Sequence, residues 1–293
     1  MKKTLDEKVF VGLSYFVTFI IALICFIPFW LIVIGSFTSE QEILTKGYSF
    51  IPDHFSLNAY KMVFEIPEKI INAYGVSIFI TVIGGGLSIF LTAMSAFVLM
   101  RKDFEYRNKI AFIFYFPTIF SGGMIPSYIL IVKYLGLKDN LLSLILPGLL
   151  AAWNIFLMRN FMKDIPDSIM ESAKLDGAND FRIFISLYLP LSGAGLATIG
   201  LFIALGYWNN WYNAMLYIDS THLYPLQYLL YQMLANITGL REAASSAGIV
   251  ITDMPSETFK MAMAVITTGP IIFLYPFVQK YFVKGLTVGA VKG

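Results

Sequence analysis

Aromatic and amide side chains follow one another in the run Trp208-Asn209-Asn210-Trp211-Tyr212-Asn213, and a shorter pair of the same chemistry is Trp153-Asn154. Aromatic faces stack on the C–H faces of sugar rings, while amide groups donate and accept the hydrogen bonds that sugar hydroxyls need. The same Trp and Tyr residues also form the aromatic belts of membrane proteins. Because the longer run contains three asparagines, we interpret both segments as the lining of a sugar pathway, with an aromatic belt as the alternative.

Residues that could catalyse a reaction or bind a metal are scarce. The sequence contains no G-x-x-x-x-G-K-[ST] phosphate-binding motif, and no Gly-Lys pair occurs in it. The two histidines, His54 and His222, stand apart from other potential ligands, and the single cysteine, Cys25, lies in an apolar run. The run Gly84-Gly85-Gly86 lies in another apolar stretch, where it indicates close helix packing. We therefore predict no catalytic residue, no metal site, no bound cofactor and no enzymatic activity for this chain.

The elements that position these side chains are predicted to be membrane-spanning helices. Of the 293 residues, 57% are hydrophobic and 14% are charged, a composition unlike that of a soluble enzyme. The net charge of +2 provides no basic surface for a nucleic acid. Apolar stretches long enough to cross a bilayer predict six spans, at about 10–36, 73–99, 110–132, 141–161, 187–217 and 261–281. The predicted fold class is all-α, with residues 1–293 forming one polytopic domain in the lipid bilayer.

The distribution of basic residues predicts the orientation. Fourteen of the 21 Lys and Arg residues lie at the two termini or in the connections after the second and fourth spans. By the positive-inside rule this side is cytoplasmic, so both termini are predicted to be cytoplasmic. The outer loop 219–260 contains the charge-free segment 220–240, in which Leu226, Leu230 and Met233 recur at helical spacing. We interpret this segment as an amphipathic helix at the outer surface rather than as a seventh span.

The cytoplasmic loop 159–190 is longer than a simple chain reversal requires. Pro166 suits a first helical turn, and Asp167 beside it complements the helix dipole. Apolar residues then recur every three or four positions and predict one apolar stripe, made of Ile169, Met170, Ala173, Gly177, Phe181 and Phe184. We expect Gly177 to adopt the left-handed turn that ends one helix before the next begins.

Within this loop, Glu171-Ser172-Ala173, then Gly177, and then Leu187-Tyr188-Leu189-Pro190 resemble a known motif. It is the E-A-A-x3-G-x9-I-x-L-P loop of the membrane permease subunits of binding-protein-dependent ABC importers. Ser172 and Leu187 depart from the motif but are conservative in size. The segments 121–126, 153–160 and 279–293 are similar to the second permease of maltose-type carbohydrate importers. Within that family the chain looks most like the branch that handles complex oligosaccharides and polysaccharide fragments, such as alginate or pectin-derived chains.

The resemblance implies a type I ABC importer permease in the cytoplasmic (inner) membrane. The partners that it implies are a homologous second permease, two cytoplasmic ATPase subunits that hold ATP and Mg, an extracytoplasmic solute-binding protein and an oligosaccharide substrate. The loop would present a coupling helix whose apolar stripe docks in a groove of the ATPase. The ATPase-coupling residues that it implies are Glu171, Ser172, Ala173, Asp176, Gly177 and Pro190 in the loop, with Lys284 and Gly285 in a C-terminal tail that reaches the ATPases.

Two rival functions are disfavoured by the residues. An ion-coupled secondary transporter usually keeps an ionisable side chain within a span, whereas the only charges inside the predicted bounds, Arg159 and Lys280, lie near the cytoplasmic ends. A membrane enzyme would need a constellation of catalytic carboxylates, histidines or cysteines, which the sequence does not offer.

Overall fold

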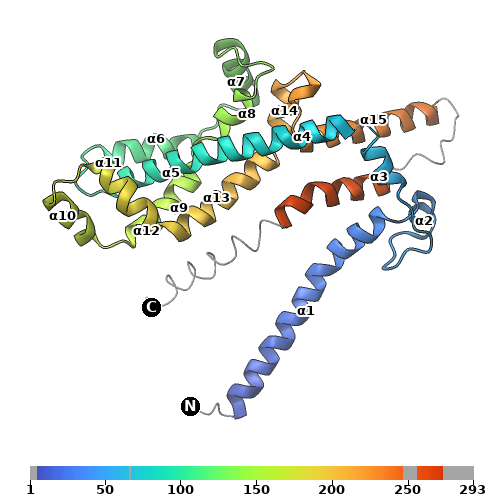
Figure 1. The fold of residues 1–293 in the computed structure, drawn as a ribbon, viewed down its shortest axis with the longest axis horizontal. Coiled ribbons are helices and arrows are strands. Elements are labelled where there is room, and N and C mark those ends of the chain that lie inside the picture. The colour runs from blue at the N-terminus through green and yellow to red at the C-terminus, as the bar shows by residue number, and fades with distance from the viewer. Residues whose placement is uncertain (1–4, 66, 247–255, 273–293) are drawn as a thin grey trace. The chain divides into compact units, whose positions relative to one another are not determined.

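The computed structural model of the chain describes residues 5–65, 67–246 and 256–272. Across these residues the secondary structure is helical, without a strand and with one isolated bridge between Thr38 and Phe55 (Figure 1). The predicted all-α class is therefore confirmed. The described residues form two compact units, one made of 5–65, Pro67, 232–246 and 256–270 and the other of 68–231 with 271–272.

The first unit contains α1 (Leu5–Ser36), α2 (Glu40–Lys46), α3 (Asn58–Val63), the later part of α15 (Leu226–Ser246) and the helix formed by residues 257–272. The stretch Glu7–Ser36 is apolar enough to cross a membrane, and none of its most apolar window is buried within the chain. The carboxylate of Glu40 accepts hydrogen bonds from the backbone N–H groups of Glu257 and Thr258, at 3.0 and 2.9 Å. It thereby caps the N-terminus of the helix formed by residues 257–272.

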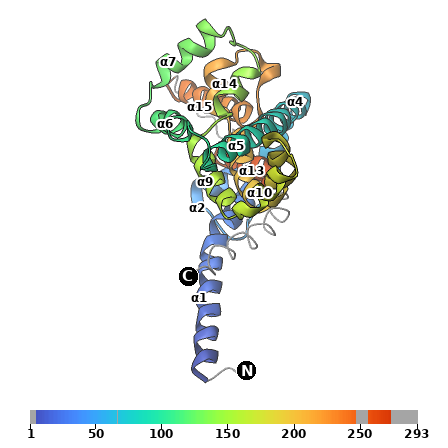
Figure 2. The same cartoon turned by 90° about the vertical axis from the view of Figure 1, so that its left-hand side faces the viewer.

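The second unit is built around one long helical run, α4 (Pro67–Phe79), η1 (Ile80–Gly84) and α5 (Gly85–Met100). Against α5 pack α9 (Ala152–Lys163) and α13 (Gly193–Trp208), which lie beside it in the end-on view of Figure 2. Their shared core includes Phe97, Met158 and Ile199. The predicted helix at 220–240 is present from Leu226 onward, in α15, which continues to Ser246.

Three pairs of helices in this unit are sharply bent. The first bend, of 116°, lies between α6 (Arg107–Ile119) and the helix made of α7 (Met124–Ile129) and η2 (Leu130–Tyr134). The second, of 52°, lies between the helix made of α8 (Leu142–Ile145) and η3 (Leu146–Gly148) and α9. The third, of 84°, lies between the helix made of α11 (Asp180–Ile183), η4 (Phe184–Tyr188) and α12 (Leu189–Leu191) and α13. If each pair is one span, the described residues hold up to five candidate spans. Of the predicted sixth span, residues 273–281 lie outside the described residues.

The bend before α9 is held by a side chain from α5. The buried hydroxyl of Ser88 donates to the carbonyl oxygen of Leu149 at 2.9 Å and lies 3.3 Å from that of Gly148. A break in a membrane helix leaves carbonyls without their helical partners, so a donor at this point stabilises the bend.

Candidate functional site

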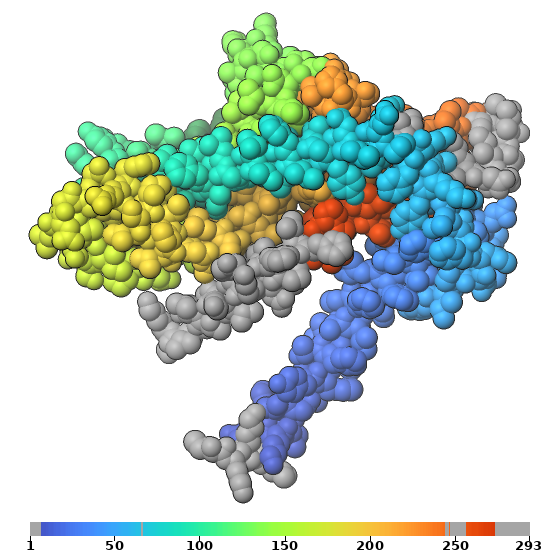
Figure 3. All heavy atoms as spheres, viewed as in Figure 1, coloured from blue at the N-terminus to red at the C-terminus, as the bar shows by residue number. Residues whose placement is uncertain are grey.

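The cytoplasmic loop folds as two short helices around a glycine. α10 (Asp167–Leu175) begins after Pro166, and α11 begins after Asn179, whose side-chain oxygen accepts a hydrogen bond from the backbone N–H of Arg182 at 2.8 Å. Between them Gly177 has a φ of 78°, in the left-handed region. The predicted turn at Gly177 is therefore confirmed, and Figure 3 shows α10 and α11 in yellow at one end of their unit.

The apolar stripe of α10 faces the chain's own core. Met170 is 9% exposed and belongs to the same core cluster as Phe184, and Ala173 packs against that cluster. The predicted stripe is therefore divided, since Met170 and Phe184 lie in the core whereas Gly177 and Phe181 are exposed. Helical spacing identifies an apolar face without identifying what covers it, and docking on an ATPase stays a prediction. The exposed face instead presents Glu171, Ser172 and Asp176, together with Leu175 (89% exposed) and Phe181 (63%).

An ionic network holds both short helices to the loop after α5. Arg101 pairs with Asp103 through two bonds, from Nη2 to Oδ2 at 2.6 Å and from Nε to Oδ1 at 3.0 Å. Nη1 of Arg101 lies 2.6 Å from Oδ2 of Asp180 on α11, and Nζ of Lys174 on α10 lies 2.9 Å from Oδ2 of Asp103. These hydrogen bonds from Arg101 and Lys174 hold the pKa of Asp103 well below its usual range. Sequence analysis missed this network, for which the only sign is the run Arg101-Lys102-Asp103 directly after a predicted span.

A pocket of about 230 Å³ lies beside α10, between it and the same loop. Its lining combines charge and apolar surface, from Met100, Arg101, Lys102, Asp103, Asp167, Met170, Glu171 and Lys174. Of the predicted coupling residues, Glu171 therefore borders a recess, while Pro190 lies apart on α12, where it is exposed. Lys284 and Gly285 lie outside the described residues.

A second pocket of about 230 Å³ collects three of the predicted pathway residues, Asn154, Asn210 and Asn213. Asn210 Nδ2 donates to the carbonyl oxygen of Leu144 at 3.0 Å. The side chains of Asn154 and Asn213 have no hydrogen-bond partner among the described residues. The pocket therefore presents amide groups that are available to a polar ligand. The rest of its lining is Gly148, Ala151, Phe202, Ile203, Gly206 and Tyr207.

Tyr207 fixes one wall of this amide pocket, and sequence analysis missed it because aromatic residues are abundant throughout the chain. It is 4% exposed, and its hydroxyl donates to the carbonyl oxygen of Ile145 at 2.8 Å. The glycines that make room for its ring are Gly84 and Gly148, since a Cβ atom on either would lie about 3 Å from the ring or its hydroxyl. The interpretation of the glycine run as a close-packing element is consistent with this contact.

The other predicted pathway residues point elsewhere. Trp208 is 7% exposed and packs near Tyr74, with ring centroids 6.3 Å apart. Asn209 accepts a hydrogen bond from Gln227 Nε2 at 3.0 Å. The run is split because α13 ends at Trp208 and α14 (Trp211–Tyr217) begins three residues later, which turns neighbouring side chains in different directions.

The remaining aromatic candidates are exposed. Trp211 contacts Tyr231 at a centroid distance of 5.0 Å, and the hydroxyl of Tyr212 donates to Sδ of Met124 at 3.0 Å. Trp153 is 74% exposed. In the described part of the chain, no group of three or more His, Cys, Asp or Glu residues is arranged to hold a metal ion.

Comparison with known proteins assigns the family. The chain is 41% identical over 289 residues to the polygalacturonan/rhamnogalacturonan transport system permease protein YtcP of Bacillus subtilis (strain 168). The aligned region covers 99% of this chain and 100% of that relative. It is also similar to a chain in the crystal structure of a bacterial ABC transporter involved in the import of the acidic polysaccharide alginate. The TM-score is 0.78 and the sequence identity 30%, and the match covers 96% of this chain and 99% of the other. The chain belongs to the permease subunits of carbohydrate ABC importers.

More distant permeases point the same way. The arabinooligosaccharides transport system permease protein AraQ of Halalkalibacterium halodurans is 28% identical over 290 residues, which cover 96% of this permease and 97% of the relative. No protein-family model matches the chain. The relatives confirm a transport component rather than an enzyme, and as an ABC permease the chain works with separate subunits that hydrolyse ATP.

Proposed function

We propose that this permease forms half of a translocation pathway for oligosaccharides released from acidic plant or algal polysaccharides, of the pectin and alginate type. The observation that carries the proposal is the 41% identity, over nearly the whole chain, to a permease named for polygalacturonan and rhamnogalacturonan. The structural likeness to an alginate importer supports the same class, because alginate and polygalacturonan are both chains of uronic acids.

The amide pocket supports contact with such a substrate. Asn154 lines it from α9, and Asn210 and Asn213 line it from the N-cap and the first turn of α14, so that three amides border one space. Amide N–H groups donate hydrogen bonds to carboxylate and hydroxyl oxygens alike, and amide oxygens accept from hydroxyls. A neutral lining can donate hydrogen bonds to a uronate unit of the substrate without an ion pair that would hold it tightly. Such weak binding suits a substrate that has to pass through the pocket.

The membrane arrangement belongs to the same proposal. We infer six spans at the predicted positions, with both termini in the cytoplasm and the protein in the cytoplasmic membrane. The partners would be a homologous second permease, two ATPases that bind ATP and Mg, and a solute-binding protein that delivers the sugar to the outer loops. The strong excess of Lys and Arg on the side of the termini supports this orientation.

The coupling role is proposed for the exposed face of α10 and α11. Leu175 and Phe181 are exposed apolar side chains on either side of the Gly177 turn, and Glu171 and Ser172 lie on the exposed surface of α10. A rigid apolar knob with a polar rim fits a groove on an ATPase. The ionic network of Arg101 would carry a displacement of this knob to α5.

Uptake by the reconstituted transporter tests the substrate class. Proteoliposomes that contain the whole complex, with its solute-binding protein and ATP, are given labelled oligogalacturonides, alginate oligomers, arabino-oligosaccharides or maltotriose. We expect saturable, ATP-dependent uptake of the uronate oligomers and little uptake of maltotriose. Saturable uptake of neutral oligosaccharides without uptake of the uronates would overturn the acidic substrate class while leaving the permease assignment intact.

A further inference from the structure

The loop after α2 presents an apolar tip on a polar base. Residues 47–52, Gly-Tyr-Ser-Phe-Ile-Pro, contain no charge. Tyr48, Phe50 and Ile51 are 57%, 56% and 77% exposed. An uncharged segment with three large apolar side chains in the open is unusual in water, where such residues tend to gather inside or at interfaces.

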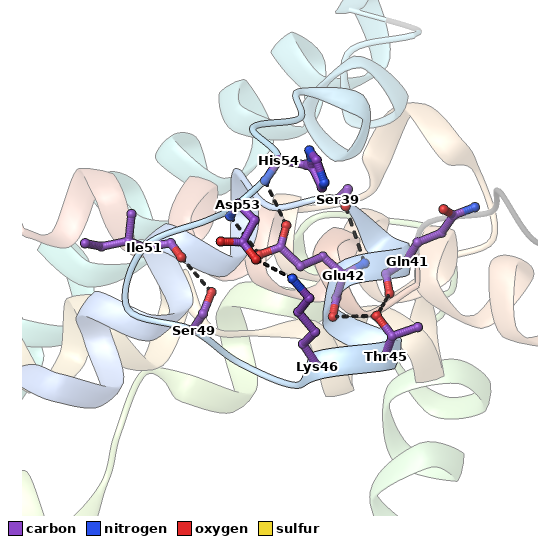
Figure 4. A network of polar contacts seen from close by, with 9 residues as sticks. All are labelled: Ser39, Gln41, Glu42, Thr45, Lys46, Ser49, Ile51, Asp53 and His54. Atoms are coloured by element: carbon purple, nitrogen blue, oxygen red, sulfur yellow. Dashed lines mark hydrogen bonds and ion pairs between the residues drawn. The ribbon is translucent and has the colours of Figure 1, made fainter.

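The base of this loop tip is held firmly by carboxylates (Figure 4). The buried carboxylate of Glu42 accepts hydrogen bonds from the backbone N–H groups of Asp53 and His54, both at 2.9 Å. Lys46 and Asp53 form an ion pair across the mouth of the loop. Ile51 points away from this network. The tip is therefore displayed by a rigid support and is not a loose segment.

One hydrogen bond fixes the tip beside α1. The indole Nε1–H of Trp30 donates to the carbonyl oxygen of Phe50 at 3.1 Å. Trp30 precedes the end of α1 at Ser36 by more than one helical turn, so the chain folds back along α1 to reach it. The tip thus lies alongside the apolar helix rather than beyond its end.

The position of Trp30 along α1 sets the depth of the tip. The last charge before the apolar part of α1 is Lys8, and the apolar run begins with Val9 and Phe10. Twenty residues of helix at 1.5 Å each span about 30 Å, the thickness of the hydrocarbon core, so a core that starts near Phe10 ends near Trp30. Tryptophan is enriched at this boundary between headgroups and acyl chains.

From this juxtaposition we propose that the loop tip, residues 47–52, inserts into the headgroup–acyl boundary of the bilayer and anchors the start of the outer loop. The surface beside it favours lipid over a protein partner, because residues 12–30 of α1 are exposed on every side of the helix. Tyr48, Phe50 and Ile51 add exposed apolar surface next to Trp30, to which the carbonyl of Phe50 is bonded. That the leaflet is the outer one rests on the proposed cytoplasmic N-terminus.

Depth-dependent quenching tests the anchor in the complete transporter. Cys25 is first replaced by Ala, and Ile51→Cys is labelled with bimane in proteoliposomes of phosphatidylcholine and phosphatidylglycerol. The control is Gln41→Cys, at an exposed polar position on the first turn of α2. Lipids that carry a doxyl group near the headgroup should quench the Ile51→Cys label at least threefold more than the control label, while aqueous iodide should show the opposite order.

Other outcomes overturn the proposal. Equal quenching of both labels, with iodide reaching the Ile51→Cys label freely, would place the tip in water. A label that neither quencher reaches would show that another subunit covers the tip. Trp30→Phe keeps the ring but removes the N–H donor, and we expect it to bring the quenching of the Ile51→Cys label towards that of the control. An impermeant thiol reagent added from outside tests the leaflet separately, so a wrong orientation is distinguishable from a missing anchor.

Discussion

The ring of Tyr207 fills the space in which a side chain at Gly84 would have to lie. A Cβ atom on Gly84 would be 2.9 Å from Cε1 of Tyr207, whereas packed carbon atoms stay about 3.5–4.0 Å apart. Because the hydroxyl of Tyr207 is also bonded to the carbonyl oxygen of Ile145, the ring has little freedom to move aside. The glycine at 84 therefore determines where the wall of the amide pocket stands.

Gly84→Ala is expected to impair transport and stability together. Overpacking of this kind costs about 1–3 kcal/mol and displaces the ring that lines the pocket. The uptake rate and the thermal stability of the purified complex report the two effects. The matched control is Gly86→Ala, since no atom lies within 4 Å of a Cβ at that position. Indistinguishable behaviour of the two variants would contradict the close packing at Gly84.

Alanine substitutions of Asn213 and Trp208, both in the run 208–213, are expected to affect different properties of the transporter. Asn213→Ala should raise the KM for oligosaccharide uptake severalfold without lowering the yield of complex, because its amide lines the pocket without a protein partner among the described residues. Trp208→Ala should lower the yield or thermal stability, since removal of a buried Trp costs about 3–5 kcal/mol. Uptake kinetics measured beside the yield of complex separate the two. The reverse pattern would assign the sugar contact to Trp208.

Gly177→Val is expected to uncouple ATP hydrolysis from uptake while the protein remains folded. The φ of 78° is strained for a β-branched residue, at a cost of about 1–2 kcal/mol, and no neighbouring atom would clash with the added side chain. Gly177→Asn serves as the control, because asparagine tolerates the left-handed conformation. The measurement is sugar uptake per ATP hydrolysed. Normal coupling in the Val variant would show that the turn is unimportant for transmission.

Asp103→Asn is expected to loosen both short helices at once. It weakens the bidentate pair with Arg101 and the bond to Lys174, and bidentate pairs in a network are the surface ion pairs that matter. We expect less uptake per ATP in the variant than in the native protein. This difference should become smaller at high salt, because salt weakens the ion pairs of the native protein. Lys102→Gln is the control, since its pair with Asp167 is exposed on both sides. If both variants couple normally, the network does not position α10.

The acid limit of the same network follows from the pKa of Asp103. The hydrogen bonds from Arg101 and Lys174 lower this pKa from 3.8, so the stabilisation is complete above that value and is lost only as the pH falls through the lowered one. Uptake per ATP in the native protein should therefore not change through titration of Asp103 at any pH above about 4. A contrary result would be a loss of coupling at pH 5–6 in the native protein that is absent from the Asp103→Asn variant. It would show that the carboxylate titrates in that range.

Local backbone chemistry was predictable from the sequence, whereas the direction of side chains was not. Gly177 could be assigned as a turn because a glycine after a helical run has one common use. The stripe through Met170 and Ala173 was also visible, but its partner was not, since the core cluster to which Met170 belongs is assembled from α5, α9, α11, η4 and α13. Periodicity identifies a face, and only tertiary packing decides what it meets.

The amide run shows the same limit at closer range. Trp208 and Asn213 were predicted to share one lining, yet one is buried at 7% exposure near Tyr74 and the other borders the pocket. The break between α13 and α14 separates them, and the residues at this break, Asn209 and Asn210, are among those predicted to line the sugar pathway. Asn210 serves both purposes, because it bonds the carbonyl oxygen of Leu144 and lines the pocket.

The bond from Ser88 to the bend before α9 bears on how the chain is made. Ser88 precedes Gly148 and Leu149 by 60 and 61 residues, so the ribosome delivers the donor well before the carbonyls that need it. We expect the long helix of residues 67–100 to be inserted before the broken segment, with its hydroxyl already in place. Because exposed carbonyls are costly in hydrocarbon, a bent segment that enters beside this donor would have a lower insertion cost than the same segment alone. The order of synthesis would then favour formation of the bend.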